Sequence, residues 1–172
     1  MSYAFSLHQT DWGCLAAVWS EAGLWELTFP LSSAQTAQAK LMTKVNSQAG
    51  GSCVERLDAE LKAYFSGTLF AFSTPVDWSG YTLFQTSILQ YTADIPCGEV
   101  RTYGAAAAAA GSPRAARAAG GALHSNRTPI VVPCHRVIGA TGGLVGFGGG
   151  LDMKARLLEL ERKVHSGCLS NV

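Results

Sequence analysis

The 172-residue sequence lacks several features that would assign it to common protein classes. No apolar run approaches the roughly 18 residues of a membrane-spanning helix, and no basic segment followed by a long apolar one marks a secretory signal at the N-terminus. The cysteines form no CxxC pair; they are Cys14, Cys53, Cys97, Cys134 and Cys168. We therefore expect a soluble, cytoplasmic protein without disulfides, and we exclude fibrous and disulfide-scaffold classes.

Charged residues are few, at 15%, and the net charge of +1 conceals an asymmetry between two halves. Residues 1–80 hold four Lys/Arg against seven Asp/Glu, whereas residues 81–172 hold nine against five. Because the turn at residues 78–80 separates these compositions, we predict two domains with these bounds. The basic half is the candidate for contact with phosphate, although a solvated surface of mixed charge would give the same composition.

The first domain is predicted to be a small α+β unit. Residues 14–19 and 23–29 look like the strands of a hairpin, and residues 33–45 and 53–65 have helical composition and spacing. No group of residues in this half has an obvious chemical role.

The second domain is predicted to be mostly helical, with helices over residues 84–93, 103–110, 113–123 and 152–164. Thr102 can cap the second helix, and Ser112 with Pro113 suits the start of the third. The second and third helices form a helix-turn-helix candidate, although any pair of short helices joined by a tight turn would produce this pattern.

The third predicted helix has little side-chain bulk. Its small residues are Ala115, Ala116, Ala118, Ala119, Gly120, Gly121 and Ala122. Tight packing between helices would explain them. Alternatively, Arg114 and Arg117 lie three residues apart, hence on one face, and a smooth helix with two arginines suits a groove lined by phosphates.

A Cys-His pair follows a predicted apolar strand over residues 130–132. Cys134 comes directly after Pro133 and is followed by His135 and Arg136. A nucleophilic thiol needs a base or a positive charge nearby, but neighbours on a strand point to opposite faces, so a structural cysteine remains an alternative. A metal site is disfavoured, because no second Cys/His pair has the spacing of metal ligands.

The last predicted helix places a carboxylate on its apolar face. Glu161 follows Leu157 and Leu158 by four and three residues. A buried carboxylate requires a partner, and His135 is chemically suitable, which would make a Cys-His-Glu relay. The alternative is that Glu161 pairs near Arg162 or with solvent at the helix end.

These residues belong to a recognisable pattern. Residues 132–138, VPCHRVI, resemble the active-site signature of the O6-alkylguanine-DNA alkyltransferases. The resemblance covers roughly residues 84–161, in the order and spacing of that family. Its other matching blocks are residues 95–100 with Tyr103, residues 115–122, and residues 149–151 with 157–161.

The resemblance implies an α+β fold, with a small N-terminal domain containing an antiparallel sheet and a mostly helical C-terminal domain with a winged-helix-like helix-turn-helix. It implies direct-reversal DNA repair, in which the alkyl group of O6-alkylguanine, and of O4-alkylthymine, passes irreversibly to Cys134 after base flipping. It also implies a monomer that binds the minor groove of double-stranded DNA, without cofactor, metal or membrane.

The resemblance further implies roles for individual residues. In catalysis Cys134 accepts the alkyl group, His135 is the base through a water molecule, Glu161 orients His135, and Asn126 is a hinge that braces the site. In the alkylguanine pocket the residues are Tyr103, Val137, Gly148 and Gly149. The Cys134 and Val137 carbonyls accept from the guanine amine, and the Gly148 N–H faces O6.

On DNA, Arg117 is implied to enter the base stack as an arginine finger, while Tyr103 helps to rotate the nucleotide. The other expected DNA contacts are Arg114, Ala116, Ala118, Gly120 and Arg127. Two rival functions are a non-enzymatic DNA-binding protein that senses alkylation and a Cys-His hydrolase.

Overall fold

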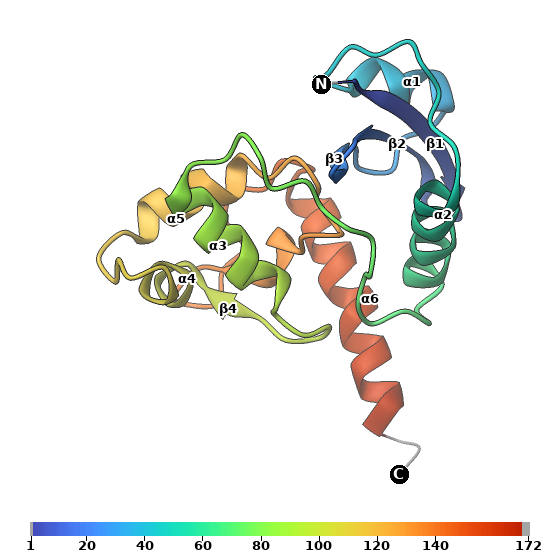
Figure 1. The fold of residues 1–172 in the computed structure, drawn as a ribbon. Coiled ribbons are helices and arrows are strands. Elements are labelled where there is room, and N and C mark those ends of the chain that lie inside the picture. The colour runs from blue at the N-terminus through green and yellow to red at the C-terminus, as the bar shows by residue number, and fades with distance from the viewer. Residues whose placement is uncertain (1, 170–172) are drawn as a thin grey trace. The chain divides into compact units, whose positions relative to one another are not determined.

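The computed structural model describes residues 2–169, with side chains through residue 164. This part of the chain forms two compact units (Figure 1). The first comprises the described residues up to Ser79 together with Arg127–Val131. The second comprises Gly80–Asn126 and the described residues from Val132 onward. The chain therefore crosses between the units three times.

The first unit contains an antiparallel sheet in the order β1-β2-β3. Its strands are β1 (Ala4–Thr10), β2 (Gly13–Ser20) and β3 (Gly23–Leu27). The hairpin predicted for residues 14–29 is confirmed as β2 and β3. β1 was not predicted, although from Ser6 its residues alternate between buried and exposed, the pattern of a strand with one covered face.

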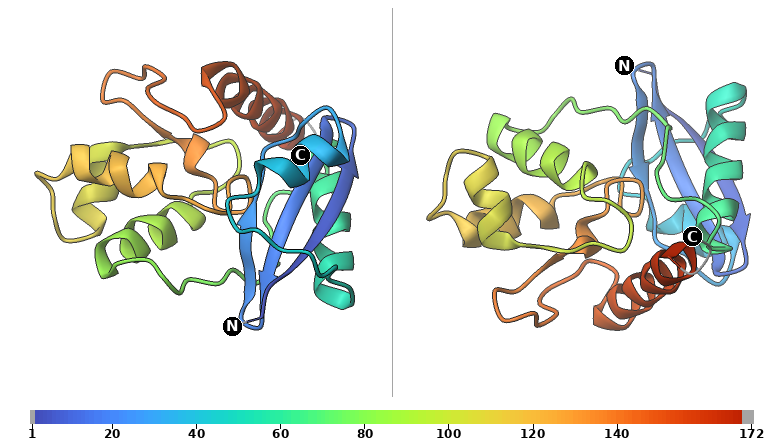
Figure 2. Two further views of the ribbon diagram at one scale, coloured as in Figure 1. Left: turned by 90° about the horizontal axis from the view of Figure 1, so that it is seen from above. Right: turned by 90° about the horizontal axis from the view of Figure 1, so that it is seen from below.

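Two helices cover this sheet: α1 (Ala34–Lys40) packs against β2, and α2 (Ser52–Phe65) lies along β1 (Figure 2). The prediction of one helix over residues 33–45 is wrong at its C-terminal end. The buried carboxylate of Glu26 accepts hydrogen bonds from the Met42 and Thr43 N–H groups, at 2.6 and 3.0 Å. These amides cannot also serve a helix, so the chain turns after Lys40.

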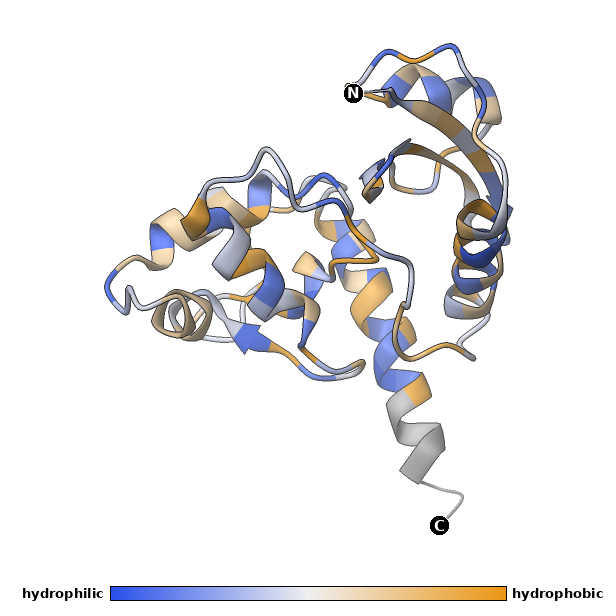
Figure 3. Cartoon of the chain, in the orientation of Figure 1, coloured by the Kyte–Doolittle hydropathy of each residue, from blue (hydrophilic) through white to orange (hydrophobic). Residues whose placement is uncertain are grey.

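The second unit is mainly helical, as predicted. Its elements are α3 (Leu83–Ala93), β4 (Arg101–Thr102), α4 (Tyr103–Ala109), α5 (Ala116–His124), the 3₁₀ turn η1 (Cys134–Arg136), β5 (Val137–Ile138) and α6 (Leu151–Leu169). Thr102 caps α4 by accepting from the Ala105 N–H at 3.1 Å, as expected. Figure 3 shows hydrophobic and strongly hydrophilic residues mixed along the coloured part of α6.

The third predicted helix begins later than expected, at Ala116 instead of Pro113. The Ser112 N–H donates to the Ala107 carbonyl at 2.9 Å and so closes the end of α4, with Gly111 at a φ of +73°. The Ser112 carbonyl then accepts from the Ala115 N–H in a turn. Ser112 therefore terminates one helix and does not cap the next.

The strand predicted over residues 130–132 is also absent. Ile130 has a φ of +77°, which is incompatible with an extended strand, and only isolated bridges flank it, at Pro129 and Val132. The run of apolar residues at 130–132 is typical of a buried strand. Here these side chains are buried although the backbone forms a turn.

No helix within residues 2–169 combines the length and the apolar character that crossing a lipid bilayer requires.

Glu60 of α2 holds residues 73–74 against the helix, and its contribution to the stability of the first unit can be tested. Its buried carboxylate accepts from the N–H and hydroxyl groups of both Ser73 and Thr74, at 2.6 to 3.2 Å. We expect Glu60→Gln to lower the free energy of unfolding by about 1–3 kcal/mol in urea denaturation, because an amide cannot accept all four hydrogen bonds. The exposed Glu21→Gln is the matched control, and an equal loss there would contradict this explanation.

Candidate active site

Cys134 is the first residue of η1, which packs against α3 and α6. Its N–H donates to the Val132 carbonyl at 2.8 Å, and the residue is 8% exposed. Because η1 is a tight turn and not a continuing strand, His135 does not simply point to the face opposite Cys134. The thiol is thus held on a short, rigid segment with little solvent access.

The carboxylate of Glu161 on α6 is the centre of a buried charge cluster. His135 Nε2 lies 2.8 Å from Glu161 Oε1, and the two side chains are 0% and 1% exposed. Arg136 donates to both carboxylate oxygens, each at 2.9 Å, and also to the Ile95 carbonyl. The Gly98 N–H completes the cluster at 3.4 Å from Oε2. The structure therefore brings together the predicted pair His135 and Glu161, and adds Arg136.

The charge of Glu161 is stabilised by these partners. Burial alone would raise the pKa of Glu161, but the hydrogen bonds and charges of His135 and Arg136 outweigh burial and hold this pKa well below its usual range. The carboxylate of Glu161 is 1% exposed and pairs with His135 and Arg136, so the alternative of a solvated Glu161 at the helix end is wrong. The neighbouring Arg162 pairs with Glu159 at 2.8 Å. An ionised Glu161 accepts from His135 Nε2–H, which makes Nδ1 the ring nitrogen with the acceptor lone pair.

Two further groups act on the Cys134 sulfur. The Asn126 side chain hydrogen-bonds the sulfur and also donates from Nδ2 to the Val132 carbonyl at 2.9 Å. The ammonium group of Lys154, on a residue that is 0% exposed, adds a positive charge nearby and donates to the Val137 carbonyl at 2.7 Å. Both stabilise a thiolate.

The resting protonation state is nevertheless neutral at both reactive groups. Burial raises the pKa of Cys134, and Asn126 and Lys154 only partly oppose that shift. Burial lowers the pKa of His135, and Glu161 only partly opposes it. The site therefore rests as a thiol beside a neutral imidazole, which can accept a proton.

Lys154 is the residue that the sequence reasoning missed. It lies three residues before Leu157 and seven before Glu161, on the same buried stripe of α6. The rule that singled out Glu161, a charge on an apolar helical face, would also have found Lys154.

Tyr103 contacts the glycine-rich loop, residues 139–150, through the carbonyl group of Val145. The Tyr103 hydroxyl donates to the Val145 carbonyl at 3.1 Å, and Lys154 Nζ lies 3.3 Å from the same oxygen. The parallel pairing of β4 with β5 aligns Thr102 with Ile138, which positions Tyr103 near the Cys134 turn. In the same loop, Gly148 and Gly149 form a turn, and their predicted pocket role stays a prediction.

The Val137 carbonyl, predicted to accept from the guanine amine, already accepts from Lys154. A carbonyl oxygen has two lone pairs and can accept a second hydrogen bond, and the contact with guanine stays a prediction.

The outward face of α5 is small and basic. Arg117 and Ala118 are exposed, as is Arg114 in the preceding turn, whereas Ala119, Ala122 and Leu123 are buried. A Cβ added at Gly121 would meet nothing within 4 Å, and one at Gly120 would only touch the Tyr103 ring at 3.8 Å. Packing within the unit therefore explains the buried alanines but not the small residues that face outward.

Arg127, one of the expected DNA contacts, makes its observed contacts within the first unit. Its guanidinium lies 3.5 Å from the centroid of the Trp25 ring and donates to the Ser79 carbonyl at 2.6 Å. These contacts use one nitrogen and one face of the guanidinium, and the expected contact of Arg127 with DNA stays a prediction.

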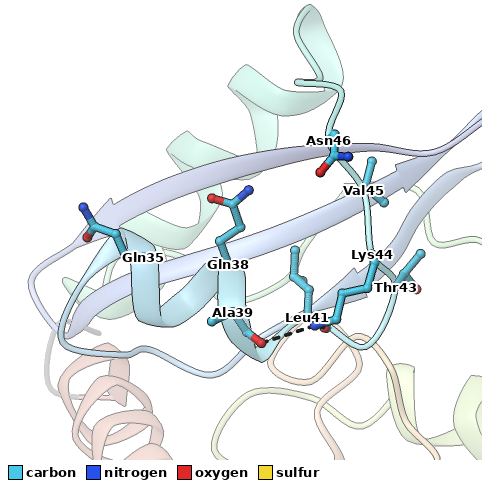
Figure 4. Close-up of a pocket in the computed structure, with 8 residues that line it drawn as sticks. All are labelled: Gln35, Gln38, Ala39, Leu41, Thr43, Lys44, Val45 and Asn46. Carbon is cyan, nitrogen blue, oxygen red and sulfur yellow. Dashed lines mark hydrogen bonds between the residues drawn. The ribbon is translucent and has the colours of Figure 1, made fainter.

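Other candidate sites are weaker. Within the described residues no group of three His, Cys, Asp or Glu side chains could hold a metal ion. The four cysteines with described side chains are free thiols, and the Cys168 side chain lies outside the described ones. A pocket beside α1 in the first unit is lined by Gln35, Lys44 and their neighbours (Figure 4), and it contains none of the predicted site residues.

Comparison with known proteins gives the family. Residues 83–163 match the family model described as 6-O-methylguanine DNA methyltransferase, DNA binding domain. The methylated-DNA–protein-cysteine methyltransferase of Mycobacterium leprae is 51% identical over 104 residues, which are 60% of this chain and 62% of that protein. The same-named protein of Mycolicibacterium paratuberculosis is 48% identical over 118 residues, 69% of this chain and 68% of that protein. The match thus spans a little under two thirds of the Mycobacterium leprae relative.

Solved structures extend the likeness over nearly the whole chain. The O6-methylguanine methyltransferase of Mycobacterium tuberculosis has a TM-score of 0.77 at 34% identity, covering 94% of both chains. A structure of the Mycobacterium tuberculosis protein in complex with DNA has a TM-score of 0.80, again at 34% identity and 94% coverage of both chains. On this likeness, and on a CHR turn whose histidine and arginine share one buried carboxylate, the chain belongs to the methylated-DNA–protein-cysteine methyltransferase family.

Proposed function

We propose that this protein repairs alkylated DNA by moving the alkyl group from O6 of a guanine in duplex DNA to the sulfur of Cys134. The observation that carries the proposal is the buried His135–Glu161 hydrogen bond beside Cys134, in a chain of this family. A thioether does not leave as a thiolate under mild conditions, so each chain reacts once. The reaction takes place in the compartment that holds the DNA.

The proton route follows from the resting state. The Cys134 thiol passes its proton to neutral His135 through a water molecule, and Glu161 stabilises the imidazolium that forms. The sulfur then bonds to the alkyl carbon, and the carbon–O6 bond breaks with its electron pair going to oxygen. The guanine gains a proton at N1. In the overall reaction the thiol proton therefore moves to the guanine, and no cofactor is consumed.

Asn126 and Lys154 assist the step in which the sulfur becomes negative. A hydrogen bond and a nearby ammonium favour the thiolate at the moment it forms, although burial keeps the resting thiol protonated. In this scheme the nucleophile develops its charge inside the site, where water does not compete for it.

Access to O6 in a duplex requires the nucleotide to leave the base stack, which costs a few kcal/mol. We assign α5 to the minor groove, because its outward face is smooth and carries Arg117. Arg117 fills the gap in the stack, and Tyr103 exchanges its hydrogen bond from Val145 to the base. We therefore propose that the protein flips the damaged nucleotide out of the duplex. We also propose that it accepts the alkyl group of O4-alkylthymine.

The first prediction tests the acceptor atom. Incubation with duplex DNA containing O6-methylguanine should add the mass of one CH₂ to Cys134 in intact-protein and peptide mass spectrometry. Cys134→Ser should abolish this addition while DNA binding persists, because a serine hydroxyl is a far weaker nucleophile. Cys97→Ser is the matched control and should react normally. DNA binding without lasting alkylation in the unmodified protein would favour the sensor or the hydrolase instead.

The second prediction concerns base extrusion. Arg117→Ala should slow methyl transfer from duplex DNA by roughly tenfold to a hundredfold, but leave the reaction with free O6-methylguanine base nearly unchanged. Arg114→Ala removes another exposed charge and should weaken duplex binding without this selective loss. Single-turnover rates on both substrates provide the measurement. Equal slowing on both by Arg117→Ala would assign Arg117 to the fold.

The third prediction tests the smooth face of α5. Ala118 is exposed, so Ala118→Leu should leave the melting temperature almost unchanged, since leucine is also a good helix former. Duplex affinity should fall at least tenfold because the added side chain keeps the helix out of the groove. Ala155→Leu on the exposed face of α6 is the control and should bind normally. Normal DNA affinity of Ala118→Leu would remove α5 from the interface.

A further inference from the structure

Between Asn126 and Cys134, two residues of the candidate active site, the chain includes a five-residue segment that belongs to the first unit. The chain leaves the second unit after Asn126, contributes Arg127–Val131 to the first, and returns at Val132. The hydrogen bond from Asn126 Nδ2 to the Val132 carbonyl, at 2.9 Å, closes the base of this segment. Cys134 comes two residues after Val132, and the Asn126 side chain donates a hydrogen bond to its sulfur. The positions of both ends of the segment therefore affect the surroundings of the sulfur.

Arg127 attaches the beginning of this segment to the first unit by three kinds of contact. Its guanidinium stacks on Trp25 at 3.5 Å from the ring centroid. Its NH2 group donates to the carbonyls of Ser79 and Asp77, at 2.6 and 3.4 Å. Its own carbonyl accepts from the Leu27 N–H of β3 at 2.8 Å. The planar guanidinium suits this combination of stacking and directed donation.

The partners of Arg127 are themselves fixed. Trp25 Nε1 donates to the Thr43 hydroxyl at 3.1 Å, and its ring packs against Tyr3 with centroids 5.3 Å apart. The Asp77 carboxylate accepts from the Ser20 hydroxyl and from the Ser79 N–H. Arg127 is therefore held on a rigid platform and not on a loose loop.

The far part of the segment is strained. Ile130 is 1% exposed and has a φ of +77°, a conformation that a β-branched residue adopts only where its surroundings impose it. Packing within the first unit thus dictates the path of residues 127–131. If the Arg127 attachment were lost, this strain would favour a different path.

We propose that Arg127 is a positioning residue for Cys134: by attaching residue 127 to Trp25 and Ser79, it holds the adjacent Asn126 where its side chain reaches both Val132 and the sulfur. This inference rests on the proposed function only in that Cys134 is the acceptor. It gives the N-terminal unit a part in the chemistry, through the covalent path of the chain.

The test measures the reactivity of the Cys134 thiol as a function of pH. Iodoacetamide modification of Cys134 is followed by peptide mass spectrometry, and the exposed Cys53 in the same molecule is the internal reference. Arg127→Ala should raise the pH midpoint of Cys134 by about one unit, because a hydrogen bond to the thiolate is weakened, and leave Cys53 unchanged. The ionisable side chains that interact with Cys134, which are Lys154 and Tyr103, are the same in every variant, and so is the adjacent His135.

Three variants separate positioning from stability. Arg127→Lys keeps the charge but loses the planar stack, so it should show a smaller rise than Arg127→Ala. Trp25→Leu should raise the midpoint as well, and the double variant Trp25→Leu/Arg127→Ala should shift no further than the larger single one. Glu60→Gln destabilises the same unit without touching residues 127–131, and it should leave the midpoint where it is.

Two results would overturn the inference: an unchanged midpoint in folded Arg127→Ala and Arg127→Lys proteins, or an equal rise in Glu60→Gln. The same variants should slow single-turnover methyl transfer in proportion to the shift. A protein that shifts as expected but accepts no methyl group from DNA would refute the proposed function and leave the positioning role intact.

Discussion

The second unit depends on the hydrogen bonds and ion pairs that the buried carboxylate of Glu161 makes. Burying a carboxylate that is only 1% exposed requires partners, and Glu161 receives hydrogen bonds from two separate segments of the chain, at Gly98 and at the consecutive residues His135 and Arg136. Arg136 also donates to the Ile95 carbonyl, which lies just after α3. The Glu161–Arg136 pair therefore connects three parts of the unit: α6, η1 and the segment that follows α3. The same contacts that hold the fold together orient the imidazole.

A second buried charge on α6 organises the other side of the turn. Lys154 binds the Val137 carbonyl just beyond η1 and reaches the Val145 carbonyl of the glycine-rich loop. Its positive charge also favours the thiolate of Cys134. Burial lowers the pKa of this lysine, as expected for an ammonium group out of water. One helix thus supplies a negative charge for the imidazole and a positive charge for the sulfur.

The arginines of the basic half serve different purposes despite their proximity in sequence. Among the arginines of residues 114–136, Arg136 pairs with Glu161, and Arg127 stacks on Trp25 and donates to two carbonyl groups. Arg114 and Arg117 are exposed near the start of α5. Net charge alone could not distinguish these cases, because a guanidinium satisfied inside the protein contributes to the count but not to a phosphate-binding surface. The small outward residues of α5 then give the exposed pair a surface that can approach a groove.

The sequence by itself determined the local chemistry: a thiol next to a histidine, a carboxylate on an apolar helical stripe, and capping signals such as Thr102. These follow from neighbours within a few residues, and family resemblance made their roles explicit. Only the tertiary structure decided that Arg136 shares Glu161, that Lys154 belongs to the site, that Arg127 stacks on Trp25, and that residues 130–132 turn instead of extending. The physical reason is that periodicity shows which charge must be buried, whereas its partner is whichever distant segment the fold brings within hydrogen-bonding distance.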